Sequence, residues 1–289
     1  MKKPLIAFFG TPEFAVWTLE SMKKHGILPS LIVTAPDAPK GRKLVLTPPP
    51  VKIWAEENNI PVIQPKEVKS DEFRKEIETK LGGRPDLFIV SAYGKILTKA
   101  LIEQPRHGTI NVHPSLLPLL RGASPLESAI LSDMRDTGVT IMRIDEELDH
   151  GPLLAQEEAL LSTWPIDTDT LGRLLAHLGG DLLARILPSL LDGTLTETPQ
   201  DHTRATFTKK IKKEDGLMDL SADGYENFLK WNAYRGWPGS YFFIEKDGKK
   251  IRISIREAEY VDEQFIVKKV VPEGRREMTF AEFESWAQS

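Results

Sequence analysis

Short apolar runs alternate with segments of helical periodicity over the first two thirds of the chain. The apolar runs are PLIAFFG (4–10), PSLIVTA (29–35), IPVI (60–63), PDLFIVSAYG (85–94), HGTINVH (107–113) and TGVTIMRID (137–145). The spacing of apolar residues predicts helices over 12–25, 49–59, 70–83, 124–131 and 170–191. Alternating strands and helices, with strands apolar on both faces, are typical of a parallel sheet covered on both sides. The pattern therefore predicts a doubly wound α/β fold with a mostly parallel sheet.

The pattern changes after the last of these helices. The stretch DGTLTETPQDHTRATFTKKIKKEDG is polar and lacks clear periodicity, so we expect an interdomain linker over 194–213. An amphipathic helix, three strand-like runs and a last helix follow, over 221–234, 241–248, 249–261, 264–271 and 280–286. Strands without alternating helices favour a small open β-barrel of the OB type. We therefore expect a catalytic domain at 1–193 and a smaller β-barrel domain at 214–289.

Composition and charge restrict the class of protein. The chain has 289 residues, 40% of them hydrophobic and 28% charged, which is ordinary for a two-domain globular protein. There is no cysteine, which excludes disulfides and thiolate zinc sites. No apolar run approaches the roughly 20 residues of a membrane span, so we expect a cytoplasmic protein without membrane contact. The net charge of −4 gives no basic domain, and any nucleic acid must be bound by local clusters.

Polar side chains occur at the ends of two predicted strands. Asn111 and His113 lie two residues apart on one strand, so their side chains face the same way. The 137–145 strand runs into an acidic segment that ends at Asp149. Ligands of open α/β sheets lie beyond the carboxyl ends of the strands, where a carboxylate can orient an imidazole or accept a proton. The alternative is that Asn111 caps a turn and His113 is a structural histidine.

Two other kinds of chemistry are disfavoured. The sequence has no Gly-x-Ser-x-Gly motif and no cysteine, which favours direct transfer over a covalent acyl-enzyme. The six histidines have no tight ligand spacing, so we expect no metal.

Four motifs resemble the signature of the 10-formyltetrahydrofolate-dependent formyltransferase family: NVHPSLLP, RGASP, TGVTIMRIDEELDHGPLL and SAYGKIL. The resemblance covers most of the first 190 residues, and the spacing between Asn111 and Asp149 agrees with it. It implies a formyltransferase-type Rossmann-like fold and transfer of a formyl group from 10-formyltetrahydrofolate to an amine. The segments FFGTPEFAVWTL, PDAPKGRKLVLTPPPVK and TKKIKKEDGLMDLS are most similar to members whose acceptor is methionine esterified to initiator tRNA.

The resemblance implies roles for individual residues. Asn111 and His113 would stabilise charge on the formyl oxygen, and Asp149 would accept the proton of the attacking amine. The predicted folate-binding residues are Tyr93, Gly94, Ser115, Leu116, Leu117, Pro118 and His150. A core position for the Tyr93 ring is the alternative.

The tRNA contacts are predicted in two basic clusters. The residues are Lys40, Arg42, Lys43, Lys209 and Lys210. Phosphate contacts of this kind position the RNA and depend on salt. The chain departs from the family in the sequence around Arg42, and its second domain lacks a hairpin between REAEYV and QFIVKKVV. We expect a monomer.

Two other functions remain open from the sequence. The same core would suit a formyltransferase acting on an amino sugar nucleotide, since no broadly basic surface is predicted. The second alternative is a folate- or RNA-binding module that has lost catalytic activity, although all three candidate catalytic residues are present.

Overall fold

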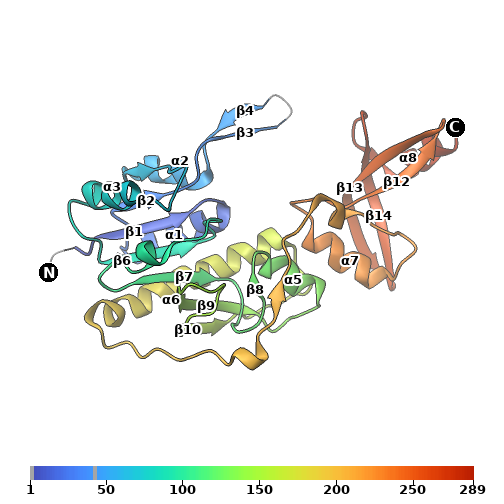
Figure 1. Ribbon diagram of the computed structural model, residues 1–289. Helices are drawn as coiled ribbons and strands as arrows, with labels where there is room; N and C mark the ends of the chain where they lie inside the picture. Colours follow the sequence, from blue (N-terminus) through green and yellow to red (C-terminus); the bar gives the residue numbers. More distant parts are fainter. Residues whose placement is uncertain (1–2, 42–43) are drawn as a thin grey trace. The chain divides into compact units, whose positions relative to one another are not determined.

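A seven-stranded sheet organises the first part of the chain (Figure 1). The computed structural model describes residues 3–41 and 44–289. The strands run in the order β10-β9-β7-β6-β1-β2-β5, in which β7, β6, β1, β2 and β5 are parallel, β9 is antiparallel to β7, and β10 is antiparallel to β9. Their bounds are β1 (Ile6–Gly10), β2 (Leu31–Val33), β5 (Val62–Ile63), β6 (Leu87–Ser91), β7 (Thr109–His113), β9 (Gly138–Arg143) and β10 (Leu153–Glu158). The predicted mostly parallel sheet is confirmed.

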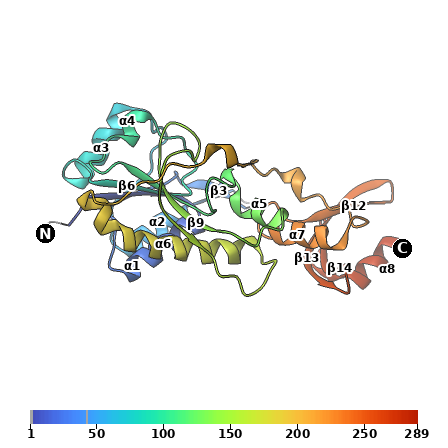
Figure 2. The same ribbon diagram turned by 90° about the horizontal axis from the view of Figure 1, so that it is seen from below.

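Helices cover both faces of this sheet (Figure 2). Helices α3 and α4 lie on one face, and α1 and α6 lie on the other. The helix bounds are α1 (Glu13–Lys24), α2 (Pro50–Glu57), α3 (Asp71–Leu81), α4 (Lys99–Ile102), α5 (Pro125–Leu131) and α6 (Thr168–Asp192). Strand β10 was not predicted, because it lies at the edge of the sheet and its sequence LLAQEE is half polar.

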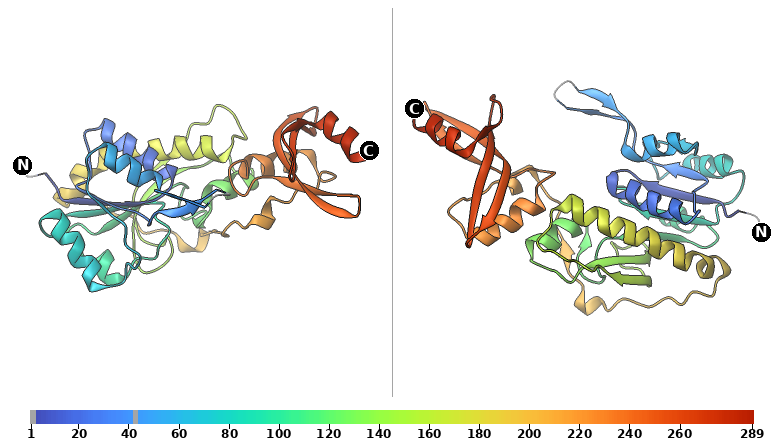
Figure 3. Two further views of the ribbon diagram at one scale, coloured as in Figure 1. Left: turned by 90° about the horizontal axis from the view of Figure 1, so that it is seen from above. Right: turned by 180° about the vertical axis from the view of Figure 1, so that it is seen from behind.

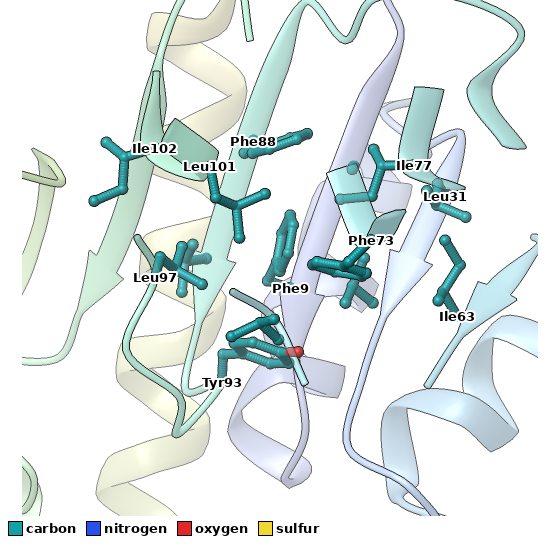
Figure 4. Packing of buried hydrophobic residues seen from close by; sticks show 14 of the residues in the cluster. Phe9, Leu31, Ile63, Phe73, Ile77, Phe88, Tyr93, Leu97, Leu101 and Ile102 are labelled. Carbon is teal, nitrogen blue, oxygen red and sulfur yellow. The ribbon is translucent and has the colours of Figure 1, made fainter. Parts of the chain in front are cut away.

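The ends of α3 show how local sequence sets an element. The Ser70 hydroxyl accepts the N–H of Phe73 at 3.2 Å and caps the helix, and Gly82 ends it with φ 71°. Phe73 thereby reaches a core between the sheet and α3 and α4 (Figure 4). In that core the Phe9 ring lies 4.9 Å from Phe88 and 5.4 Å from Tyr93, in tilted and edge-on geometry. These aromatic contacts anchor the start of the segment that follows β6.

Helix α6 is the one described helix that is long and apolar enough to cross a membrane by length and composition alone. Half of its most apolar window is buried, and it runs beside α1 (Figure 3). A Cβ on Gly179 would lie 2.6 Å from Val112, and one on Gly180 would lie 2.5 Å from Ser21. The helix therefore packs closely on β7 and α1. Arg173, Asp181 and Arg185 interrupt α6, so it holds no continuous apolar run of the length of a membrane span, and its apolar positions serve two packing surfaces.

The chain forms two compact units whose bounds differ from the predicted domains. The first unit is Met1–Gly122, Asp136–Leu160 and Gly172–Phe207, and the second is Ala123–Arg135, Leu161–Leu171 and Thr208–Ser289. Within the second unit α5 packs against α7 (Gly224–Ala233), and the Tyr225 hydroxyl donates to Asp133 at 2.9 Å. The predicted domain boundaries at residues 193 and 213 remain a prediction, because they concern which parts of the chain fold independently.

The second unit contains a four-stranded antiparallel sheet, in the order β12-β13-β14-β15. Its strands are β12 (Tyr241–Lys246), β13 (Lys249–Val261), β14 (Gln264–Pro272) and β15 (Met278–Thr279), and α8 (Phe280–Gln288) ends the chain. Phe242, Val270 and Phe283 belong to the core that this sheet shares with α7 and α8. The predicted strands are confirmed, whereas the open barrel is not. Asp262 and Glu263, with φ of 49° and 61°, join β13 to β14 in a tight hairpin.

Short strands complete the structure. They are β3 (Ala38–Lys40) paired with β4 (Val45–Thr47), and β8 (Arg121–Gly122) paired with β11 (Phe207–Thr208). Short 3₁₀ turns occupy His202–Arg204 and Lys213–Gly216. The segment predicted as a linker is partly paired, because Thr198 exchanges two backbone hydrogen bonds with Leu153 and the Thr206 carbonyl accepts from Arg121 N.

We expect Gly180→Ala to lower the free energy of unfolding by about 1–3 kcal/mol, because the new methyl group would collide with Ser21 on α1. This loss should exceed the gain of about 1 kcal/mol from the better helix propensity of alanine. Urea denaturation measures the change. Gly83→Ala is the control, since its Cβ would meet only Leu5 at 3.6 Å. A Gly180→Ala protein as stable as the unmodified chain would contradict the packing of α6.

Candidate active site

Strand β7 carries two of the predicted catalytic side chains at the middle of the sheet. Asn111 pairs with Val90 on β6 and Met142 on β9, so its backbone is held on both sides. His113 ends the strand and is only 3% exposed. The Asn111 amide is half-buried, and no side-chain hydrogen bond engages it within the described part of the chain. The amide is therefore available to a ligand, while the imidazole is enclosed.

The His113 ring has one possible proton arrangement in its neutral form. Its Nε2 lies 3.0 Å from the carbonyl oxygen of Leu120, which can only accept, so Nε2 carries the hydrogen. Its Nδ1 lies 3.7 Å from Oδ2 of Asp149. Neutral His113 thus presents an unprotonated Nδ1 on the side of the carboxylate. A proton taken up at Nδ1 would form an imidazolium next to that carboxylate.

Asp149 lies in the loop between β9 and β10, in a left-handed conformation with φ 48°. Its side chain is 14% exposed, and its Oδ2 accepts the N–H of Gly122 at 2.8 Å. Gly151 follows, and a Cβ there would lie 2.2 Å from the carbonyl oxygen of Arg143. The structure thus brings together His113 and Asp149, as the sequence predicts.

Three consecutive residues hold these two side chains. The Leu120 carbonyl accepts from His113, and the Gly122 N–H donates to Asp149. Between them, the Arg121 guanidinium is 3% exposed and donates to the side-chain oxygen of Gln200. The motif RGASP was the only sequence signal for this segment, and no motif pointed to Gln200, which lies in the predicted linker.

The predicted folate-binding segment 115–118 is held firmly. Ser115 is 1% exposed, and its hydroxyl donates to the Leu119 carbonyl at 2.6 Å. Leu117 is 3% exposed, its N–H donates to Thr140 Oγ1, and its carbonyl accepts from Gln156. Leu116 and Pro118 are half-buried. The Ser115 and Leu117 side chains therefore support the segment from within.

The other predicted folate residues differ in exposure. The Tyr93 ring is 5% exposed and packs against Phe9, and burial raises the pKa of its hydroxyl (Figure 4). Its side chain is thus a core aromatic, whereas Gly94, with φ 78°, is exposed. The His150 ring stacks on His202, with ring centroids 4.0 Å apart, and its Nδ1 lies 2.7 Å from Oδ2 of Asp145.

The predicted tRNA-binding residues lie in separate places. Lys40 is exposed on β3, and Lys209 and Lys210 are exposed after β11. Arg42 and Lys43 lie outside the described residues. Within residues 3–41 and 44–289, no group of three or more histidine, aspartate or glutamate side chains is placed to hold a metal ion.

Comparison with known proteins identifies a family and similar sequences. Residues 2–187 match the family described as formyl transferase. A methionyl-tRNA formyltransferase from Chloroflexus aurantiacus is 43% identical over 251 residues, which are 86% of this chain and 78% of that protein.

Solved structures share the fold. A methionyl-tRNA formyltransferase from Clostridium thermocellum has a TM-score of 0.60 and 17% identity, covering 93% of this chain and 99% of that chain. A sugar N-formyltransferase from a Shewanella species has a TM-score of 0.64 and 18% identity, covering 89% and 98%. At such identities these two structures show the fold alone.

We expect Thr140→Val to destabilise the protein by about 2–4 kcal/mol. The Thr140 hydroxyl donates to the Ser115 carbonyl at 2.6 Å and accepts from Leu117 N at 3.1 Å and from Gln156 at 2.8 Å. Valine has the same shape but leaves buried polar groups without partners, at about 1–3 kcal/mol each. Chemical denaturation measures the loss. Thr79→Val is the control, because the Thr79 hydroxyl is exposed and bonds only the Lys75 carbonyl. Equal destabilisation by the two substitutions would refute the buried hydrogen-bonding role of Thr140.

Proposed function

The chain belongs to the formyl transferase family, and from that premise we propose how three of its side chains carry out the transfer. The enzyme transfers a formyl group to methionyl-tRNA, the reaction for which relatives of 40–43% identity are named. The proposed donor is 10-formyltetrahydrofolate, which supplies an activated one-carbon group. The proposed acceptor is the free amine of methionine on initiator tRNA, and we propose that the enzyme acts as a monomer in the cytoplasm.

One observation supports this mechanism above the others. Nδ1 of His113 and Oδ2 of Asp149 lie 3.7 Å apart, at the end of the strand that carries the Asn111 amide. Asn111 and His113 are two residues apart, so their side chains leave the same face of β7 roughly 7 Å apart. A donor for an oxyanion on β7 and a neighbouring pair of proton acceptors are the groups that attack of an amine on a formyl carbon requires.

The Asn111 amide is the proposed oxyanion donor. Attack of the amine places negative charge on the formyl oxygen, and a preorganised N–H stabilises that charge more strongly than the neutral carbonyl. The Asn111 side chain suits this role because its amide is half-buried and not engaged by other side chains of the described residues. Loss of one such donor typically raises the barrier by about 3 kcal/mol.

His113 and Asp149 are the proposed proton-transfer pair. The attacking amine becomes positively charged and must lose a proton. The Asp149 carboxylate accepts one N–H, from Gly122, and its remaining lone pairs can accept this proton directly or through a water. His113 exchanges protons with the site only at Nδ1, because its Nε2 hydrogen is donated to Leu120. Transfer of this proton from Asp149 to Nδ1 of His113 lets the imidazolium donate it to the departing nitrogen as the bond between that nitrogen and the formyl carbon breaks.

Backbone groups beside this pair are the proposed folate site. Gly94 is exposed with φ 78°, so its peptide groups can approach a planar ring closely. Leu116 and Pro118 offer half-buried backbone and apolar surface, and the His150 Nε2 is free of the Asp145 contact, which engages Nδ1. The Tyr93 ring contributes to this site by supporting the turn from the core.

The proposed tRNA contacts are phosphate contacts. Lys40, Lys209 and Lys210 are exposed, and Arg42 and Lys43 are assigned by sequence alone. An amino sugar nucleotide is the less favoured acceptor, since the sugar N-formyltransferase is 18% identical and the methionyl-tRNA relative 43%. A module that only binds folate or RNA is also less favoured, because binding alone does not require a proton-transfer pair such as His113 and Asp149.

We expect Asn111→Ala, His113→Ala and Asp149→Ala each to lower kcat by about 100-fold or more, because each removes a donor or proton acceptor used in the transition state. The measurement is formation of acid-precipitable formyl-methionine from charged initiator tRNA and 10-formyltetrahydrofolate. The matched control is the surface pair His25 and Asp181, 2.9 Å apart, whose alanine variants should keep full turnover. Near-full activity of a folded site variant would overturn that residue's role. Turnover of an amino sugar nucleotide, without turnover of tRNA, would overturn the acceptor.

We expect Lys40→Ala and Arg42→Ala to raise KM for charged tRNA and to leave KM for the folate donor unchanged. The double variant Lys209→Ala and Lys210→Ala should reduce the slope of log affinity against log salt by about 1–2, since each lost phosphate contact releases about one counterion fewer. Filter binding between 50 and 200 mM salt measures that slope. Lys75→Ala, on the exposed side of α3, is the control. Equal changes in both KM values would indicate a structural role for the β3–β4 segment.

A further inference from the structure

We infer that Gln200 is a positioning residue for Asp149. The inference rests on the proton-transfer role proposed for Asp149 and adds a residue far away in sequence. Gln200 is 5% exposed and lies in the extended segment that follows α6. It does not contact the proposed reacting atoms, and it acts through the backbone that carries the carboxylate.

Both hydrogens of the Gln200 amide are used on the Asp149 loop. The Nε2 donates to the carbonyl of Asp149 at 2.9 Å and to the carbonyl of Gly151 at 2.7 Å. The orientation of the amide is fixed chemically, because its nitrogen faces two carbonyl acceptors and its oxygen faces a guanidinium donor. One buried group therefore ties together two peptide units that flank His150.

The oxygen of the Gln200 amide connects this loop to the segment that binds the Asp149 carboxylate. It accepts from Arg121 Nε at 3.2 Å and from Nη2 at 2.6 Å. The residue after Arg121 is Gly122, whose N–H donates to Asp149 Oδ2 at 2.8 Å. The contacts form a closed ring, in which Asp149 is held at its carboxylate by Gly122 and at its carbonyl by Gln200.

Asp149 needs this second attachment because its conformation is unfavourable. Its φ of 48° is in the left-handed region, which costs free energy for a residue other than glycine, although aspartate adopts it more readily than most. Without Gln200, a single hydrogen bond from Gly122 would hold the carboxylate, and the loop could return to an ordinary backbone conformation. Displacement of a reacting group by about 1 Å can cost about 100-fold in rate.

The Arg121 side chain makes a discriminating variant possible. Arg121 is 3% exposed, and its partners here, the Gln200 oxygen and Nδ1 of His202, are both neutral. Gln200→Glu keeps the size of the side chain and gives the guanidinium a charged partner. It also removes both N–H donors and turns a carboxylate oxygen toward the two loop carbonyls. If Gln200 served only Arg121, glutamate would be at least as good.

The test is the steady-state kinetics of Gln200→Glu and Gln200→Ala with charged initiator tRNA. We expect kcat to fall by about 10–100-fold, as for other residues that orient a reacting side chain, with both KM values within twofold of the unmodified enzyme. Unchanged kcat in both variants would overturn the inference. Gln104→Ala is the control, because Gln104 also donates to a backbone carbonyl, that of Arg74 at 2.9 Å, remote in sequence from the site. An equal fall of kcat in that control would overturn the inference as well.

The same variants in the Asp149→Ala background separate this inference from the function it rests on. If Gln200 acts through Asp149, then adding Gln200→Glu to Asp149→Ala should not lower kcat further. A further 10–100-fold fall would overturn the inference and leave the role of Asp149 intact. Near-full activity of Asp149→Ala alone would overturn both, and would be recognised before the double variant is made.

Discussion

The site depends on one short stretch of backbone, Leu120 to Gly122. The Leu120 carbonyl fixes the ring of His113, and the Gly122 N–H fixes the carboxylate of Asp149. Because Leu120 immediately precedes β8 and Gly122 ends it, these two groups set the distance between an imidazole from β7 and a carboxylate from the β9–β10 loop. The 3.7 Å between His113 Nδ1 and Asp149 Oδ2 therefore depends on the position of this backbone stretch and not on either side chain alone. Arg121 lies between the two groups and anchors the stretch in the interior.

Arg121 makes the arrangement rigid at an electrostatic cost. A buried guanidinium requires hydrogen-bond partners, and removal of one would leave buried N–H donors unsatisfied. Its partners Gln200 and His202 come from the segment after α6, which also pairs with β10 through Thr198. A segment that reads as a linker in the sequence thus completes the site. Because α6 packs closely on the sheet, the position at which this segment begins is fixed. The hydrophobic core thereby helps to position the active site.

Much of the fold and part of the site could be predicted from sequence, for physical reasons. Buried parallel strands are uniformly apolar and helices are periodic, so the order of elements followed directly. Asn111 and His113 were marked as polar residues on a predicted strand, and Asp149 by the acidic segment that follows the next predicted strand. Edge strand β10 was missed because an edge strand is half polar. The Tyr93 ring was assigned to the folate site, with a core position as the alternative, and its burial against Phe9 was not visible locally. Backbone groups such as the Gly122 N–H leave no signal in the side-chain pattern.

The most direct test of this account is the tautomer of His113 in the free enzyme. In ¹⁵N-labelled protein, long-range correlations between ring protons and nitrogens show which nitrogen carries the hydrogen. In the neutral ring we expect the hydrogen on Nε2, donated to Leu120, and an unprotonated Nδ1 facing Asp149. A neutral ring with its hydrogen on Nδ1 would contradict the claim that the Leu120 carbonyl orients the imidazole.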